Sequence, residues 1–249
     1  MKFPFFLTLL SSLLFVAFCV PASLFAQSGS GNADTLCNLR GVVNVSVANL
    51  HREADFESPM ETQTLLGMPV RIRSKARWYQ VETLDGYVAW VHRAVVVPMD
   101  SLAFARWEEA PKIVVTAPFA QALSAKSPDS RPVGDLTAGC ILRLTGQDEG
   151  FYRVSYPDGR WGYVPVAQAA PLDRWLAGRR HTVENLIRTA GSLMGVPYLW
   201  AGTSARGVDC SGLIQYAALL NGIVLPRNAF QQARIGRRVP CFRDSAGRL

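Results

Sequence analysis

The sequence contains few of the residues that build disulfide scaffolds or metal sites. Only 5 of its 249 residues are cysteine and only 3 are histidine. The cysteines are too few for a disulfide scaffold and lack the paired spacing of a zinc site. They are Cys19, Cys37, Cys140, Cys210 and Cys241. We therefore expect a protein with no bound metal ion and no other cofactor.

Dense blocks of positive charge are also missing. Charged residues make up 18% of the chain, and no run of lysine and arginine with interleaved aromatic residues indicates a nucleic-acid partner. The chain is nevertheless basic, because 26 lysine and arginine residues outnumber 19 acidic residues and give a net charge of +7. Such an excess favours a mild attraction to an anionic cell envelope.

The amino terminus has the pattern of a secretory signal peptide. The positive Lys2 precedes an apolar run over residues 3–20, and small residues surround Ala26, after which we expect cleavage. A membrane anchor is one alternative, because the run is nearly long enough to span a bilayer. A lipid on Cys19 is another, although the preceding Phe18 is bulky for such processing. A signal peptide predicts an exported protein of the periplasm, cell envelope or exterior, with no stable membrane span after cleavage.

After a Gly/Ser-rich spacer, the chain shows short alternating apolar runs separated by turns. Runs rich in β-branched and aromatic residues, broken by turns such as Asp85-Gly86, are typical of small all-β units. The pattern returns at a constant offset, since Phe151-Tyr152 corresponds to Trp78-Tyr79 and Asp158-Gly159 to Asp85-Gly86. We therefore expect an internal duplication, with most of these aromatic residues packed inside each unit.

Cys210 carries the strongest chemical signal in the sequence. It follows a glycine-punctuated loop over residues 195–209 and precedes an apolar helical pattern that begins at Leu213. The free amides at a helix start stabilise an anion, which favours a thiolate over a thiol. A lone cysteine more often only fills space in a core. The polar neighbours Asp209 and Ser211 suit the edge of a ligand site, so we interpret Cys210 as a reactive cysteine.

The loop and the cysteine together resemble a known family. Pro197-Tyr198-x-Trp200-x-Gly202 followed by Asp209-Cys210-Ser211-Gly212 is similar to the nucleophile region of the NlpC-type, papain-like cysteine peptidases, which cut bacterial cell-wall peptides. Ala201 stands where that family commonly has a second glycine, and its extra methyl group suggests a minor departure. The resemblance implies that Cys210 is the catalytic nucleophile.

The same resemblance implies a substrate pocket and a bond to be cleaved. Tyr198, Asp209 and Ser211 match the family residues that line the pocket. The duplicated β pattern resembles the tandem bacterial SH3-like domains that precede such a peptidase domain. Proteins of this architecture hydrolyse the bond between γ-D-glutamate and the diamino acid of peptidoglycan stem peptides.

In the family, the first SH3-like domain supplies an acidic group and a tyrosine that recognise the free amine of the substrate's terminal L-alanine. Glu61 or Glu57 is the carboxylate candidate here, because the position expected to be acidic is occupied by Pro59. Tyr87 is the aromatic candidate, ahead of Trp90. A solvated surface charge is the alternative for either glutamate.

Helices are expected around the cysteine motif. Apolar residues recur at three and four positions from Val183 to Met194, which predicts an amphipathic helix capped by Thr182. We expect a second short helix after Arg227, whose side chain would hold carbonyl groups of the loop. Trp200 is expected to pack beneath that loop.

A catalytic imidazole is missing from the expected place. A cysteine peptidase needs a base that takes the thiol proton and later hands it to the leaving amine. In the family this histidine lies on a strand after the cysteine, whereas His51, His92 and His181 all precede Cys210. The sequence ends at Leu249 without the strands that would cover the helices. We expect a truncated domain that is inactive as written.

The predicted fold class is multidomain: two small all-β SH3-like barrels, then the helical amino-terminal half of an α+β papain-like domain whose sheet is missing. The expected parts are a signal peptide (1–26), a flexible spacer (27–37), the first SH3-like domain (38–99), a connector that is a short helix or an insertion (100–111), the second SH3-like domain (112–171) and the truncated peptidase domain (172–249).

Two functions follow from this sequence. The first is an exported, monomeric cell-wall cysteine endopeptidase that acts on L-Ala-γ-D-Glu-diamino acid stem peptides. The second is a non-catalytic envelope-binding or peptidoglycan-binding protein that acts through its SH3-like domains.

Overall fold

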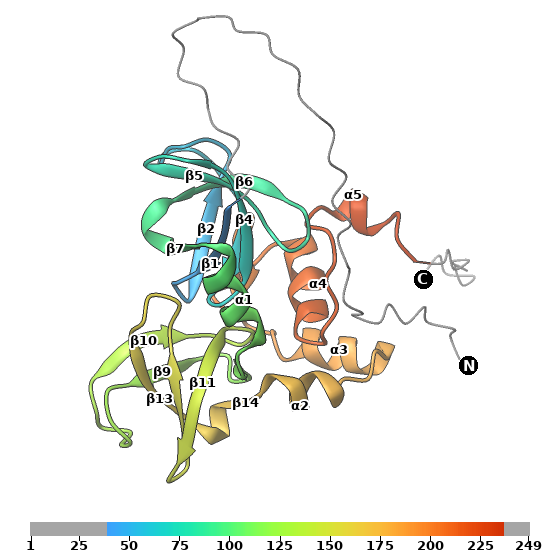
Figure 1. Ribbon diagram of the computed structural model, residues 1–249. Helices are drawn as coiled ribbons and strands as arrows, with labels where there is room; N and C mark the ends of the chain where they lie inside the picture. Colours follow the sequence, from blue (N-terminus) through green and yellow to red (C-terminus); the bar gives the residue numbers. More distant parts are fainter. Residues whose placement is uncertain (1–38, 237–249) are drawn as a thin grey trace, which may run out of the picture. The chain divides into compact units, whose positions relative to one another are not determined.

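Two antiparallel sheets joined by a short helix occupy residues 39–171, and further short helices follow them in the chain (Figure 1). The computed structural model describes residues 39–236, so the expected signal peptide, the spacer and the tail after residue 236 lie outside the described residues. All described residues belong to one compact unit. Among them, no helix has both the length and the apolar character needed to cross a bilayer.

The first sheet has seven strands in the order β3-β2-β6-β5-β4-β1-β7. These are β1 (Leu39–Val43), β2 (Val47–His51), β3 (Met60–Leu65), β4 (Pro69–Lys75), β5 (Trp78–Glu82), β6 (Val88–His92) and β7 (Val96–Met99), with a 3-10 turn η1 (Arg93–Val95) before the last strand. Alternate side chains point to opposite faces of each strand. Val70, Ile72, Val81 and Val91 therefore meet in one buried cluster.

The second sheet repeats this arrangement in the order β10-β9-β13-β12-β11-β8-β14. Its elements are β8 (Lys112–Val115), β9 (Ala120–Leu123), β10 (Pro132–Leu136), β11 (Ile141–Asp148), β12 (Phe151–Ser155), β13 (Trp161–Pro165), η2 (Val166–Gln168) and β14 (Ala169–Pro171). Each strand has its counterpart at the same place in the first sheet, as the internal duplication predicts. Trp78, Tyr79 and Tyr152 are buried, in agreement with the expectation for these aromatic residues.

A helix follows each sheet. The connector after the first sheet is a helix, α1 (Ser101–Glu109), and the second sheet is followed by α2 (Leu172–Ala177). In α1, the buried Phe104 and Trp107 pack against Val42 of the first sheet. The connector is thus tied to that sheet by apolar contacts.

The remaining described elements surround the cysteine motif. They are α3 (Val183–Gly191), the two-residue strands β15 (Thr203–Ser204) and β16 (Gly207–Val208), α4 (Cys210–Leu219) and α5 (Ala229–Gln232). The predicted helix is confirmed in α3, where the Thr182 side chain accepts a hydrogen bond from the Asn185 amide. Asn221, just after α4, donates to Thr189 of α3 at 2.9 Å. Between residues 172 and 236, β15 and β16 are the strands that the structure contains.

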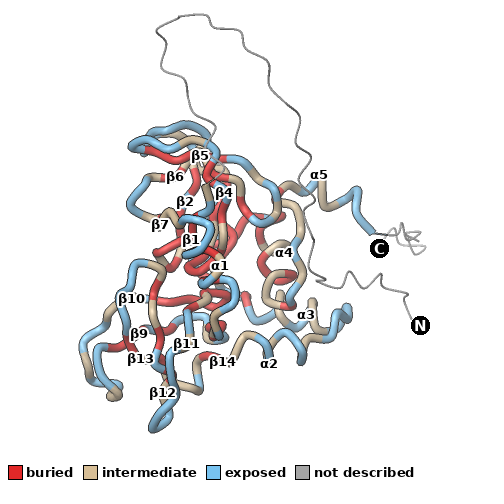
Figure 2. Tube along the Cα trace, in the orientation of Figure 1, coloured by how far each residue is buried: buried red, intermediate tan, exposed pale blue. Residues whose placement is uncertain are grey.

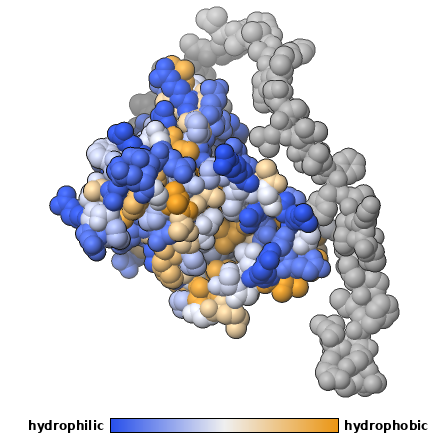
Figure 3. Space-filling view, turned by 90° about the horizontal axis from the view of Figure 1, so that it is seen from below, coloured by the Kyte–Doolittle hydropathy of each residue, from blue (hydrophilic) through white to orange (hydrophobic). Residues whose placement is uncertain are grey.

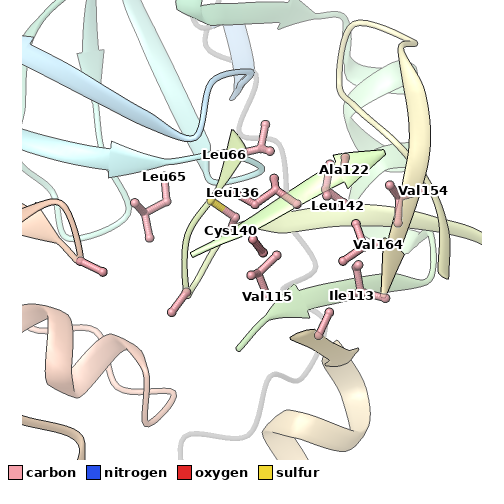
Figure 4. Packing of buried hydrophobic residues seen from close by; sticks show 14 of the residues in the cluster. Leu65, Leu66, Ile113, Val115, Ala122, Leu136, Cys140, Leu142, Val154 and Val164 are labelled. Carbon is pink, nitrogen blue, oxygen red and sulfur yellow. The ribbon is translucent and has the colours of Figure 1, made fainter. Parts of the chain in front are cut away.

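One apolar core joins the first sheet, the second sheet and α4. Buried positions, red in Figure 2, follow both sheets and continue into α4. Leu65, the last residue of β3, and the following Leu66 lie in the same cluster as Leu136 and Leu142 of the second sheet (Figure 4). Tyr216 of α4 also belongs to this cluster. The three regions therefore share buried apolar surface, which is the main favourable term in folding.

Some apolar side chains remain on the surface. Figure 3 shows hydrophobic patches scattered among hydrophilic residues on one face of the molecule. Val183 and Ile187 of α3 are exposed, as is Met194 after it. The apolar stripe of α3 therefore has little cover within residues 39–236.

Candidate functional site

Cys210 is the first residue of α4, and its thiol is exposed. Asp209 caps the helix, because its Oδ1 atom accepts a hydrogen bond from the Gly212 amide at 2.7 Å. The flanking Asp209 and Ser211 are both buried. The sequence therefore places an accessible sulfur at a helix start whose neighbours are fixed in the interior.

The glycines of the loop are required by close backbone packing. A Cβ atom on Gly212 would lie 2.0 Å from the Gly202 carbonyl oxygen, and one on Gly202 would lie 2.4 Å from the Gly207 carbonyl oxygen. Real Cβ atoms do not approach other atoms so closely. A side chain at Gly212 would push α4 away from the loop, and one at Gly202 would push apart two strands of the loop itself. The loop is thereby held directly against the first turn of the helix that carries Cys210.

Ala201 has an unusual backbone conformation. Its φ angle is 63°, in the left-handed region that favours glycine. Its amide donates to the Oδ2 atom of Asp209 at 3.0 Å, and its side chain is buried. The departure from the family glycine is therefore more than an added methyl group, because the backbone at this position is one that glycine adopts more easily.

A buried ion pair lies behind Cys210. Arg227 donates from Nη2 to Asp209 Oδ2 at 2.5 Å and from Nη1 to Asp209 Oδ1 at 3.2 Å, and the side chains are 3% and 9% exposed. Arg227 also donates from Nη1 to the Ser211 hydroxyl at 2.7 Å. The expectation that Arg227 holds loop carbonyl groups is thus wrong, since it holds a carboxylate and a hydroxyl. The reason is that Asp209 is buried and needs a cation to balance its charge.

These contacts determine the ionisation of Asp209. Burial alone would raise the pKa of its carboxyl group. Hydrogen bonds from Arg227 and from the amides of Gly212 and Ala201 outweigh burial and hold that pKa below its ordinary value. Asp209 is therefore an anion at neutral pH, with both oxygens occupied by donors from the protein.

Glu61 and Tyr87 form a second polar group, on the first sheet. The Tyr87 hydroxyl donates to Glu61 Oε2 at 2.6 Å, and Arg52 Nε donates to Glu61 Oε1 at 2.6 Å. The other candidate carboxylate, Glu57, is exposed in the loop between β2 and β3. The structure thus joins Glu61, rather than Glu57, to the tyrosine.

Hydrogen bonding also keeps Glu61 ionised. Burial alone would raise its pKa, but the hydrogen bonds from Tyr87 and Arg52 outweigh burial and lower the pKa below its ordinary value. Burial and the hydrogen bond to Glu61 raise the pKa of Tyr87 to about 12, so the tyrosine stays a hydrogen-bond donor at neutral pH. The positive charge of Arg227 favours the ionised forms of both residues.

Gln63 connects the first sheet to the cysteine loop. Its Oε1 atom accepts hydrogen bonds from the Thr203 amide at 2.9 Å and from the Ser204 hydroxyl at 3.1 Å. Its Nε2 atom donates to Asn49 at 2.9 Å. Sequence reasoning missed this residue. Gln63 lies two positions after Glu61, so both side chains are on the same face of β3. This spacing is the sequence feature that could have identified Gln63 as a neighbour of the site.

Two aromatic residues of the loop face solvent. Tyr198 is 67% exposed and Trp200 is 71% exposed. The expectation that Trp200 packs beneath the loop is wrong, because most of its side chain faces solvent. Tyr198 is bridged to Val208 through the backbone, next to the start of α4. Its exposed ring is therefore open to solvent.

The three histidines lie elsewhere. His51 and His92 flank the ring of Trp78 in the first sheet, with ring centroids 5.6 and 5.5 Å from it. His181 lies near Gly222, since a Cβ atom there would be 3.9 Å from its ring. That position is at the carboxyl end of α4, about 15 Å along the helix from Cys210. Within residues 39–236, no three His, Cys, Asp or Glu side chains gather as a metal site.

Sequence comparison finds two matching families. The NlpC/P60 family model matches residues 195–248, which contain the Cys210 loop. The model of the bacterial dipeptidyl-peptidase Sh3 domain matches residues 50–95, which contain Glu61 and Tyr87.

Curated relatives and solved structures extend these matches. Dipeptidyl-peptidase 6 of Lysinibacillus sphaericus is 30% identical over 198 residues, which are 77% of this chain and 73% of that protein. A gamma-D-glutamyl-L-lysine dipeptidyl-peptidase of Bacillus subtilis is 35% identical over 109 residues, 44% of this chain and 35% of that protein. An NlpC/P60 family protein from Bacillus cereus superposes with a TM-score of 0.70 at 25% identity, over 81% of this chain and 78% of its own.

Proposed function

Because this chain belongs to the NlpC/P60 family, we propose that it is an exported protein that recognises peptidoglycan stem peptides at the Glu61, Tyr87 and Cys210 site. Cys210 occupies the position of the family's nucleophile, which in a complete site would attack the bond between γ-D-glutamate and the diamino acid. Both sheets are SH3-like units, which is supported by the family match over residues 50–95 and by the equal strand order of the second sheet. The signal-peptide pattern of the first 26 residues supports export.

The observation that carries the proposal is the ionised Glu61 beside a donating Tyr87. A free amino terminus is a cation at neutral pH and makes charge-assisted hydrogen bonds to a carboxylate. Asp209 is less suited to this contact, because it is buried and bound by the buried Arg227 and two backbone amides, whereas the cation beside Glu61 is the exposed Arg52. Glu61 therefore binds the amine, while Asp209 holds the start of α4 and Arg227. A relative named gamma-D-glutamyl-L-lysine dipeptidyl-peptidase supports a ligand with such a terminus.

Cleavage would use the exposed thiol of Cys210. The thiolate attacks the γ-carbonyl carbon, the carbon–sulfur bond forms, and the carbon–nitrogen bond then breaks as the amine takes up a proton. Water hydrolyses the thioester and frees the sulfur. Both steps need a base beside the sulfur. His51 and His92 lie around Trp78 and His181 lies at the other end of α4, so for this chain we propose recognition without turnover.

The test is peptide binding by the full chain. Titration calorimetry with L-Ala-γ-D-Glu-L-Lys should give measurable binding, and acetylation of its amine should abolish or greatly weaken it. Glu61→Gln should weaken binding about 10- to 100-fold, because a hydrogen bond to a charged group is lost. Equal affinity for the free and the acetylated peptide would contradict the proposal.

Turnover is measured in the same samples with a Cys210→Ala control. We expect no release of lysine from the peptide by either protein. Release that the alanine substitution abolishes would mean that a base serves Cys210, and the chain would then be an active peptidase.

The second candidate is a non-catalytic envelope-binding protein that acts through the two sheets. Like the first candidate without turnover, it needs no base at the start of α4, where none of the three histidines lies. Binding to isolated cell walls that survives Glu61→Gln and amine acetylation would support this candidate over the first.

A further inference from the structure

Arg52 is bound to the Glu61 carboxylate. This is the group that, in the proposed function, binds the amine of the ligand. Its Nε atom donates to Glu61 Oε1 at 2.6 Å, while the Tyr87 hydroxyl donates to the other oxygen, also at 2.6 Å. Both oxygens of Glu61 thus have a donor from the protein. One of these donors is a cation, as the ligand's ammonium group would be.

We propose that Arg52 is a specificity-determining residue, an internal competitor whose guanidinium must leave Glu61 before a cationic amine can bind. The inference rests on the proposed role of Glu61. A ligand with an ammonium group replaces one cation by another at the carboxylate. A ligand whose amine is acylated offers no charge in exchange, so Arg52 stays in place.

The exposure of the pair allows this exchange. The side chain of Arg52 is 63% exposed, whereas that of Glu61 is 22% exposed. A single contact through Nε lacks the geometry of a two-point guanidinium–carboxylate pair, and exposed ion pairs contribute little stability. Arg52 can therefore move into water at small cost, while Glu61 remains fixed by Tyr87.

The backbone around Arg52 does not need to move. The Arg52 amide donates to the Pro59 carbonyl group at 3.0 Å across the loop that joins β2 to β3. Phe56 in this loop packs on Trp78, with ring centroids 4.7 Å apart. These contacts hold the loop, so rotation of the Arg52 side chain alone uncovers Glu61 Oε1.

The test compares Arg52→Ala with a matched control in the same sheet. Arg73 pairs with Glu82 through two hydrogen bonds, at 3.2 and 3.0 Å, and has a similar exposed position. Calorimetry with L-Ala-γ-D-Glu-L-Lys should give about 2- to 5-fold tighter binding for Arg52→Ala, the size expected when an exposed ion pair no longer competes. Arg73→Ala should bind as the original chain does, and Arg52→Lys should retain the competition.

The outcomes separate the two ideas. Unchanged or weaker binding in Arg52→Ala, together with loss of affinity in Glu61→Gln, would overturn the role of Arg52 and leave Glu61 as the amine site. Unchanged affinity in Glu61→Gln would overturn the proposed function itself. Tighter binding of the acetylated peptide by Arg52→Ala would also overturn the inference, because no cation would then be exchanged.

Discussion

At the scale of single residues, Arg227 neutralises the buried negative charge of Asp209. The guanidinium balances Asp209, which in turn caps the helix that begins with Cys210. The pair is almost fully buried, so removing one partner leaves the other as an uncompensated charge.

We predict that Arg227→Met destabilises the protein by about 3 to 5 kcal/mol at pH 7, because Asp209 would lose its buried partner. Chemical denaturation measures this difference. Arg206→Met is the control, because Arg206 forms an exposed pair with Asp135 at 2.9 Å and should cost less than about 1 kcal/mol. A similar loss in both variants would contradict the prediction.

The same variant predicts a dependence on pH. In the original chain the pKa of Asp209 is lowered, so its stabilisation is complete above the ordinary carboxyl pKa near 4 and is lost as the pH falls through the lower folded value. Without Arg227, burial should raise that pKa instead. The stability difference between the two proteins should therefore shrink between pH 7 and pH 4, and a constant difference would contradict this account.

Ala201 is a second residue whose backbone conformation lowers the stability of the fold. Its φ angle of 63° is unfavourable for a residue with a Cβ atom. Ala201→Gly should therefore raise the free energy of unfolding by about 0.5 to 1 kcal/mol. Ala205→Gly, at a buried position of the same loop without a positive φ, should lower it instead. Thermal melts of both variants measure these opposite signs.

At the scale of elements, hydrogen bonds to Gln63 join β3 to the hairpin of β15 and β16. We predict that Gln63→Leu costs about 1 to 3 kcal/mol, because the buried Thr203 amide would lose its acceptor. Hydrogen exchange at Thr203 should become faster. Gln121→Leu on the exposed side of β9 is the control and should change neither quantity. Unaltered exchange at Thr203 in Gln63→Leu would show that the hairpin does not depend on β3.

At the scale of the whole molecule, the contact between the two sheets depends on Gly67. Its φ angle is +82°, and a Cβ atom there would lie 2.1 Å from the Ile141 carbonyl oxygen of the second sheet. The neighbouring Leu66 accepts a hydrogen bond from the Ile141 amide at 2.8 Å. The sheets therefore meet backbone to backbone at this point.

Gly67→Ala should destabilise the protein by about 2 to 4 kcal/mol, through both backbone strain and the clash with Ile141. Gly86→Ala is a matched control, since Gly86 has a φ angle of +81° but no atom within 4 Å of the added Cβ. Gly86→Ala should lower the free energy of unfolding by about 1 to 2 kcal/mol, from backbone strain alone. Equal losses in the two variants, measured by thermal unfolding, would exclude a tight contact between the sheets.

Local patterns in the sequence predicted the local structure well. The alternating valines and aromatics predicted β-rich units, and the repeated pattern predicted an internal duplication, which agrees with the equal strand order of the two sheets. Thr182 marked the start of α3, and the change from a glycine-rich loop to an apolar pattern marked the start of α4 at Cys210. These features depend on neighbours within a few residues, which the sequence displays directly.

The sequence by itself determined the β-rich character of the two sheets, the helices α3 and α4, and the place of Cys210 at a helix start. Only the tertiary structure decided that Glu61 rather than Glu57 meets Tyr87, that Arg227 holds Asp209, and that Gln63 joins the first sheet to the cysteine loop. The physical reason is distance along the chain. Buried polar groups must find partners wherever packing places them, and no periodic pattern encodes which distant residue that will be.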